Sequence, residues 1–300
     1  MTVLNIPSDG SFNVLIVLFR VLWAYGSMPA KDLLSLCRAG AEADPARLRQ
    51  TLKRWTDLGL FAEDEEEVRL APDVVNGGRL SRDIGAATTA LPGLVRRIIF
   101  REENNERFWD SQGARSADLT RGLAWLLAQD IYSADLSKHA TVQELEARQV
   151  EERDRWIVRN NVRWGGLLSW GIYLGFLWCA DAPLIDPTAA LRQDLPLILS
   201  QNTELPAASF GQRVAAVLPV LDGGRYRKEV EDTLNPASWQ RPAQPELLST
   251  ALSRALWRLD AQGILVLESR ADTGDSRVLQ RMGGQHWRRF THVRLTTKAA

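Results

Sequence analysis

Two distant segments of this sequence share one pattern, an amphipathic helix with a leucine stripe that stops at a glycine. They span residues 45–61 and 244–265. Sliding the second by 204 positions onto the first aligns three stripe positions and both glycines: Leu252 with Leu48, Leu256 with Leu52, Leu259 with Trp55 and Gly263 with Gly59. An apolar pair follows each glycine. Such internal similarity predicts two supersecondary units of the same kind.

The residues around the first segment predict three helices followed by a hairpin. An apolar helix spans residues 12–25, and a second helix begins near Pro29. Asp44 is placed to cap the third helix, with Pro45 in its first turn. Short apolar stretches at residues 60–61 and 68–70 flank an acidic turn, which is typical of a β-hairpin. This is the element order of a winged helix-turn-helix domain.

The C-terminal part repeats this order, with helices over residues 209–221 and 225–234 before the second striped helix, and strand patterns after it. The intervening residues are almost entirely helical in pattern, and Trp164, Trp170 and Trp178 are expected in its core. We therefore predict a mainly α (α+β) fold with three domains. They are an N-terminal winged helix-turn-helix domain (residues 1–78), a central helical domain (79–205) and a C-terminal winged helix-turn-helix domain with a long basic wing (206–300).

Several classes of function find no support in the sequence. It lacks the phosphate-binding loop, the dinucleotide-binding glycine motif, the zinc-protease motif and the paired cysteines of zinc sites. His286 and His292 are separated by a basic strip, which disfavours a cation site. We expect a protein that is not an enzyme and that needs no cofactor or metal.

Cellular location follows from the cysteines and from the N-terminal residues. The two cysteines lie far apart, and no basic n-region of a signal peptide is visible, so we expect a cytoplasmic protein. The uncharged run at residues 164–180 is short for a membrane span, and a buried central helix is the expectation. A membrane-associated protein is the alternative that rests on this run alone.

The first striped helix offers candidate DNA-binding residues. The chain carries 37 basic and 37 acidic residues, so nucleic acid must be bound by a local patch. With the apolar stripe buried, the remaining faces carry Arg47, Arg49, Gln50, Lys53 and Arg54. Arginine and glutamine can bond base edges or phosphates. The acidic turn at residues 63–67 argues against DNA, and a protein-docking role for this domain stays open.

The second unit carries a larger basic surplus. Residues 266–300 hold seven basic residues against three acidic ones, Glu268, Asp272 and Asp275. Its candidate DNA-binding residues are Arg254, Arg258, Arg270, Arg277, Arg281, Arg288 and Arg289, with Arg294 and Lys298 adding charge. A solvated hairpin without a partner is the alternative.

The opening of the chain resembles that of DpdG-like proteins. The residues that carry this likeness are Pro7, Asp9, Gly10 and Asn13, which lead into the first apolar helix. These proteins accompany bacterial gene clusters that place 7-deazaguanine bases in DNA and restrict unmodified phage DNA. The resemblance implies an accessory component of a DNA-modification or phage-defence system, with no catalytic residues to carry over.

Two hypotheses result. The first is a non-catalytic bacterial subunit that grips double-stranded DNA through its winged helices, with other subunits of the system as partners and a homodimer as one possible assembly. The second is an adaptor whose winged helices dock partner proteins without binding DNA.

Overall fold

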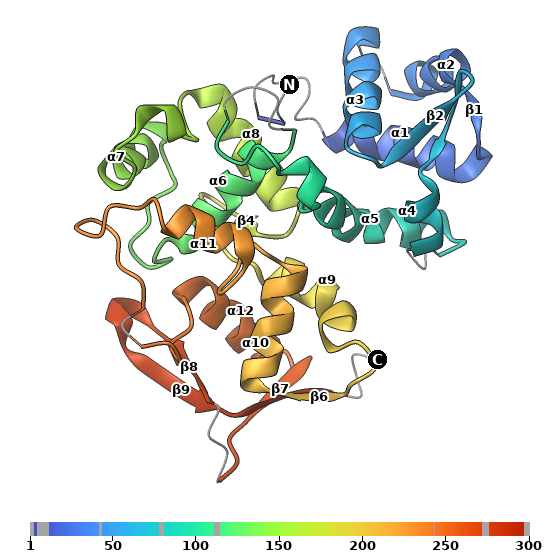
Figure 1. Ribbon diagram of the computed structural model, residues 1–300. Coiled ribbons are helices and arrows are strands. Elements are labelled where there is room, and N and C mark those ends of the chain that lie inside the picture. Colours follow the sequence, from blue (N-terminus) through green and yellow to red (C-terminus); the bar gives the residue numbers. More distant parts are fainter. Residues whose placement is uncertain are drawn as a thin grey trace.

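The computed structural model describes residues 3–4, 12–41, 44–77, 81–110, 115–242, 244–271 and 276–296. The described chain is mainly helical, which confirms the predicted mainly α (α+β) class, and its strands form four small antiparallel sheets. Figure 1 shows an N-terminal unit (residues 12–70) that stands to one side of a helical middle (72–185) and a C-terminal unit (188–296). The opening motif that carries the family resemblance lies outside the described residues except for Asn13.

The N-terminal unit contains three helices and three short strands. In chain order they are α1 (Phe12–Tyr25), β1 (Met28–Pro29), α2 (Ala30–Ala41), α3 (Pro45–Asp57), β2 (Phe61–Asp64) and β3 (Glu67–Leu70). The strands form one antiparallel sheet in the order β1-β3-β2. Asp44 caps α3 as predicted, because its side chain accepts the N–H of Ala46 at 3.0 Å. Strand β1 was not predicted, and it is only two residues long.

The acidic turn closes a tight β2–β3 hairpin, as predicted. Glu65 and Glu66 both adopt positive φ, at 48° and 73°, as a two-residue turn of this kind demands. The tip contacts the connection between α1 and α2. There the Ala30 N–H donates to the Glu66 carbonyl at 3.2 Å, and the Ser27 hydroxyl donates to Glu67 at 2.6 Å. The turn is therefore held at the start of α2.

The middle is helical around a fully buried helix. It contains α4 (Pro72–Gly77), α5 (Ile84–Ile99), α6 (Ala117–Ala128), α7 (His139–Gln149), α8 (Asn161–Tyr173) and the hairpin of β4 (Leu177–Cys179) and β5 (Pro183–Ile185), with single 3-10 turns at Glu102–Asn104 and Arg153–Arg155. Every residue of α6 is buried. This helix, rather than the apolar run at residues 164–180, is the central one.

The apolar run divides into α8 and β4. Trp164 and Trp170 are buried as predicted, but Trp178 is 50% exposed and is not a core residue. The reason is the change to a strand, in which Leu177 faces inward and Trp178 outward. Among the described helices, none combines the length and the apolar character that a membrane span requires.

The C-terminal unit repeats the N-terminal arrangement with two additions. It contains α9 (Thr188–Leu199), β6 (Glu204–Pro206), α10 (Ala207–Val217), α11 (Arg225–Glu231), α12 (Thr250–Ala261), β7 (Leu265–Glu268), β8 (Arg277–Gln280), a 3-10 turn (Met282–Gly284), β9 (His286–Phe290) and β10 (His292–Leu295). One sheet has the order β6-β10-β7, which corresponds to β1-β3-β2. The added elements are α11 and the separate β8–β9 hairpin, which lies between β7 and β10 in the chain.

The sheet order identifies which helices correspond. Strand β6 follows α9 and pairs with the last strand, as β1 follows α1 and pairs with β3. Helices α9, α10 and α12 thus correspond to α1, α2 and α3. The sequence pattern predicted α10 as the first helix of the C-terminal unit, whereas it corresponds to the second helix of the N-terminal unit. The expected domain boundary between residues 205 and 206 falls within β6. Because β6 pairs with β10 of the C-terminal sheet, we count β6 and the preceding helix α9 as parts of the C-terminal unit.

Helices α3 and α12 end in the same way, with corresponding backbone hydrogen bonds. Gly59 and Gly263 both adopt positive φ, at 89° and 68°. After each glycine, the chain bonds back to the helix: Leu60 N–H to the Trp55 carbonyl at 2.8 Å, and Ile264 N–H to the Leu259 carbonyl at 3.0 Å. The offset of 204 residues therefore holds in the structure as well as in the sequence.

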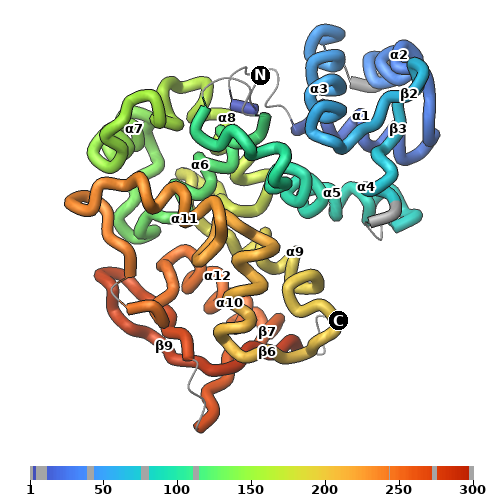
Figure 2. The backbone as a smooth tube through the Cα atoms, in the orientation of Figure 1, coloured from blue at the N-terminus to red at the C-terminus, as the bar shows by residue number. Residues whose placement is uncertain are grey.

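Polar anchors join the units to the middle. Arg96 of α5 forms a fully buried ion pair with Asp194 of α9, at 2.9 Å. Near the N-terminus, the backbone N–H groups of Val3 and Leu4 donate to the Asp118 carboxylate of α6 at 3.1 and 2.7 Å. Figure 2 shows α5 running between the N-terminal unit and the rest of the chain.

Candidate nucleic-acid interface

The outer face of α3 carries four of the predicted contact residues. Arg47, Arg49, Gln50 and Lys53 are all exposed. Their exposure follows from the apolar stripe, because Leu48, Leu52 and Trp55 are buried and turn the helix so that its charged side faces solvent. Lys53 lies 3.6 Å from Asp57, a weak contact between two exposed side chains. This face has the residue types that bond phosphates and base edges.

Arg54 does not lie where the sequence predicts it among the candidate DNA-binding residues. It was expected on the exposed face beside Arg47 and Gln50, but it is buried, with 7% of its surface exposed. Arg54 lies in the last turn of α3, where the helix meets the middle of the molecule. Trp55 packs there against Trp170 of α8, with ring centroids 5.6 Å apart. Arg54 is therefore not part of the exposed face that carries Arg47, Arg49, Gln50 and Lys53.

Helix α12 occupies the place of α3 in its own unit, but it is largely covered. Arg254 and Arg258 were expected to be free for DNA, but in the structure each has a carboxylate partner. Both contact the carboxylate of Asp186, at 3.6 and 2.5 Å, and that carboxylate is only 4% exposed. Asp186, two residues before α9, therefore offsets one of the two positive charges and holds both arginines near the body of the protein. In the 204-residue offset, Arg258 corresponds to Arg54, and both side chains turn toward the body of the protein.

The β8–β9 hairpin covers another side of α12. The backbone N–H of Gln280 donates to the Ser253 hydroxyl at 2.9 Å. Arg288 forms an ion pair with Asp260 of α12 at 2.7 Å and also donates to the carbonyl of Leu267. The predicted wing strands are present, but they fold back onto the helix that they were expected to flank.

Carboxylates neutralise part of the predicted basic wing. Arg270 donates to both oxygens of Glu204, each at 2.7 Å, and also contacts Glu268. Arg294 contacts Glu268 as well, at 2.8 Å. The hydrogen bonds lower the pKa of the Glu204 and Glu268 carboxyls, so both stay ionised at neutral pH.

Among the described residues, no carboxylate lies within ion-pair distance of Arg277, Arg281 or Arg289. Arg277 and Arg289 bond the carbonyl and the hydroxyl of Ser276, and Arg281 lies over the Trp287 ring, 4.1 Å from its centroid. Of the other charges counted in this region, Asp272, Asp275 and Lys298 lie outside the described residues.

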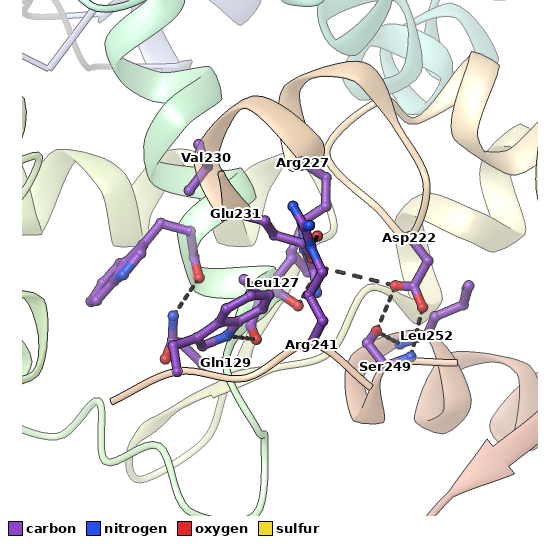
Figure 3. A network of polar contacts seen from close by, with 12 residues as sticks. Leu127, Gln129, Asp222, Arg227, Val230, Glu231, Arg241, Ser249 and Leu252 are labelled. Carbon is purple, nitrogen blue, oxygen red and sulfur yellow. Dashed lines mark hydrogen bonds and ion pairs between the residues drawn. The ribbon is translucent and has the colours of Figure 1, made fainter. Parts of the chain in front are cut away.

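A polar network fixes the start of α12 to the middle. Figure 3 shows Arg227 of α11 among Glu231, Arg241 and Asp222. Arg227 is 2% exposed, forms an ion pair with Glu231 and donates to the Leu127 carbonyl of α6 at 2.7 Å. Asp222 accepts both the N–H and the hydroxyl of Ser249, the N-cap of α12, at 2.6 Å each. This network orients α12 and uses the charges of its members internally.

Beside the network lies an open cavity of about 620 Å³. It is bordered by the end of α6, by the segment before α12 and by the β8–β9 hairpin, and its lining includes Arg227, Arg241 and His286. Arg241 forms ion pairs with Glu231 and Asp232, at 3.0 and 2.5 Å. Its pKa is raised, chiefly by the hydrogen bond with Asp232. Both arginines of the cavity are thus already paired.

The described residues contain no group of three His, Cys, Asp or Glu side chains that could hold a metal ion. The buried Cys37 thiol has a pKa raised to about 11 by burial, which keeps it protonated and unreactive.

Comparison with known proteins gives a family and no closer relative. No curated protein and no solved structure matches the chain. The model of the DpdG-like family matches residues 1–273, which include both α3 and α12 and end before β8. The family resemblance of the opening residues is thereby confirmed over most of the sequence, and it gives the protein a role in a DNA-modification system. The chain belongs to the DpdG-like family.

Proposed function

We propose that this protein is a non-catalytic, cytoplasmic DNA-binding subunit of a bacterial DNA-modification and phage-defence system, and that it grips duplex DNA through α3. In this proposal both units are winged helix-turn-helix domains, with α3 as the recognition helix. The observation that carries the proposal is the exposed face of α3, which presents three cations and a glutamine.

The chemistry of this face suits a major groove. A recognition helix has to bury one side in its own domain and present the other side to the bases. Arg47 and Gln50 lie one turn apart in the first half of α3, where the positive end of the helix dipole also favours phosphate. Arg49 and Lys53 lie one turn apart beside them, and we assign them to the phosphates that flank the groove.

The C-terminal unit has a different task in this proposal. Its helix α12 is engaged with Asp186 and with the β8–β9 hairpin, so duplex readout through α12 is not proposed. The unit is instead packed on the middle, where other subunits of the system can dock against a rigid surface.

Fluorescence anisotropy with a labelled 20-base-pair duplex, at two salt concentrations, tests the proposal. Replacing Arg47, Arg49 and Lys53 with Ala together should weaken binding about 10- to 100-fold and reduce the salt slope by about 2 to 3. The control is Ala at Arg107, Arg148 and Arg192, which removes the same charge from exposed positions elsewhere. Equal binding by both variants and the unchanged protein would refute the role of α3.

A protein-docking adaptor is the second candidate. The observation that favours it is the exposed acidic turn, residues 63–67, on the same unit as α3. Carboxylates near DNA phosphates are unfavourable, and they suit a basic protein surface instead. Tight capture of products of neighbouring genes by a protein that does not bind duplex, with loss of capture on charge reversal of this turn, would establish the adaptor.

A further inference from the structure

An aromatic cluster on the C-terminal unit has no role in duplex binding through α3. Trp257 of α12 is 42% exposed, and its ring centroid lies 5.1 Å from that of Trp287 in β9. Arg281 lies over the Trp287 ring at 4.1 Å from the centroid. We call Trp257, Trp287 and Arg281 the tryptophan patch. Trp287 is half-buried and packs against the hydrophobic core, whereas Trp257 lies outside the leucine stripe of α12 and keeps part of its ring exposed.

A β-bulge sets the direction of Trp287. In the β8–β9 register, Leu279 pairs with Arg288 and Gln280 pairs with His286, so that Trp287 is the extra residue on its strand. A bulge redirects a side chain out of the regular alternation of a strand. Here, both Trp287 and the next residue, Arg288, contact α12. The hairpin therefore holds the patch against the helix in a fixed arrangement.

The electrostatic surroundings of the patch favour a polyanion. Residues 276–294 contain five arginines and no aspartate or glutamate. Carboxylates elsewhere in the chain neutralise Arg288 and Arg294, whereas none of the described carboxylates pairs with Arg277, Arg281 or Arg289. The exposed Trp257 ring contacts Trp287, and the Arg281 guanidinium lies over the Trp287 ring, so one cluster combines a stacking surface with a cation that can contact phosphate.

We propose that the tryptophan patch binds single-stranded nucleic acid, by stacking an unpaired base on Trp257 while the hairpin arginines contact the backbone. A closed duplex hides the faces of its bases, so an exposed aromatic ring distinguishes unpaired from paired strands. This site is independent of the proposed duplex contact of α3, since it lies on another unit and uses other residues. A single protein would then hold duplex and unpaired DNA at separate places.

The first test compares labelled dT15 with a 20-base-pair duplex by anisotropy, using the full chain. Trp257→Ala should weaken dT15 binding at least tenfold, about 1.4 kcal/mol, and leave duplex binding unchanged. Trp257→Phe should keep dT15 binding within about threefold, because a phenyl ring still stacks. The control is Trp178→Ala, which removes an indole that is 50% exposed on the β4–β5 hairpin. It should bind dT15 like the unchanged protein.

A second measurement does not depend on variants. A dT15 strand that carries 5-iododeoxyuridine should crosslink to Trp257 or Trp287 on irradiation, as mapped by mass spectrometry. Failure of the protein to bind dT15, equal affinity of Trp257→Ala and Trp178→Ala for dT15, or crosslinks only outside the hairpin and α12 would each overturn the proposal. Equal loss of duplex and dT15 binding in Trp257→Ala would also contradict it. Loss of duplex binding in the α3 variant alone, with dT15 binding intact, would show that the two sites are separate.

Discussion

Helices α3 and α12 are built alike and exposed differently. Both carry the leucine stripe, stop at a glycine with positive φ, and lead into a short antiparallel sheet. In the 204-residue offset, Lys53 of α3 corresponds to Trp257 of α12, and Gln50 corresponds to Arg254. Yet α3 presents a charged face, whereas Asp186 and the β8–β9 hairpin contact α12 and engage its polar side chains.

The difference shows that a count of arginines does not measure a DNA-binding surface. The C-terminal unit has more basic residues, and on that ground it was expected to provide the stronger grip. Several of these arginines have intramolecular carboxylate partners, however, whereas Arg47, Arg49 and Lys53 of α3 are exposed. Availability of charge depends on partners that are distant in the sequence.

The largest expected effect is a loss of stability, without a loss of duplex binding, when the two paired arginines of α12 are replaced. Replacing Arg254 and Arg258 with Ala leaves the buried Asp186 carboxylate without its cationic partners, which should lower the free energy of unfolding by about 2–4 kcal/mol. Duplex affinity should stay unchanged. Urea unfolding and anisotropy on the same samples check both statements. Loss of duplex affinity without loss of stability would show that α12 binds DNA, and it would contradict the contrast between α3 and α12.

The next effect concerns the helical middle, where a buried glutamate makes stability depend on pH. Glu146 is fully buried and accepts the N–H groups of Ile157 and Val158, and burial raises its pKa to about 7. Between pH 4.5 and 7, the carboxyl of the unfolded chain loses its proton first. The unfolded state then binds fewer protons, and stability falls as pH rises until it levels off above pH 7.

Relative to Glu146→Gln, the unchanged protein should lose about 3 kcal/mol of unfolding free energy between pH 4 and pH 8. Glutamine keeps one acceptor oxygen and does not ionise. Urea titrations of both proteins at several pH values measure the difference. If the unfolding free energies of the two proteins changed in parallel with pH, Glu146 would not be the source of the pH-dependent loss of stability.

A smaller effect compares the two glycine stops directly. Both positions have positive φ, so Ala should cost about 1 kcal/mol at each. At Gly263 an added Cβ meets open space, but at Gly59 it would lie 2.8 Å from Nη1 of Arg101, which forms an ion pair with Asp73. Gly59→Ala should therefore cost about 1–2 kcal/mol, and Gly263→Ala less. Thermal unfolding would show the order, and a larger loss at Gly263 would contradict it.

The smallest expected effect is a change in duplex affinity when a negative charge on the exposed face of α3 is removed. Asp57→Asn removes the negative charge 3.6 Å from Lys53 on the exposed face. Stability should change by less than about 0.5 kcal/mol, because both side chains are exposed. Duplex affinity should rise about twofold, as one repulsive charge near the phosphates is lost. A fall in affinity at low salt would show that DNA does not approach this face.

Local features were predictable from the sequence. The first helix has the predicted bounds, Phe12–Tyr25, and Asp44 caps the third helix. The acidic turn closes a hairpin, and the 204-residue offset is confirmed in the backbone bonds after each glycine. These features depend on neighbours within one or two turns of the chain, so the pattern of a short segment specifies them.

Features set by distant neighbours were not predictable. Asp186 reaches Arg258 across 72 residues, and nothing in the local sequence marks this pair. The return of the β8–β9 hairpin onto α12 and the burial of Arg54 likewise depend on how the units pack. Trp257 was missed, although one signal was present, a tryptophan outside the leucine stripe of an otherwise well-patterned helix.

Photo-crosslinking at equivalent positions of the two helices tests the central claim most directly. Benzoylphenylalanine is placed either at Lys53 or at Trp257, and each protein is irradiated with the same 20-base-pair duplex. The account predicts a crosslink to duplex from the position in α3 and none from the position in α12. A crosslink from α12 with none from α3 would contradict it.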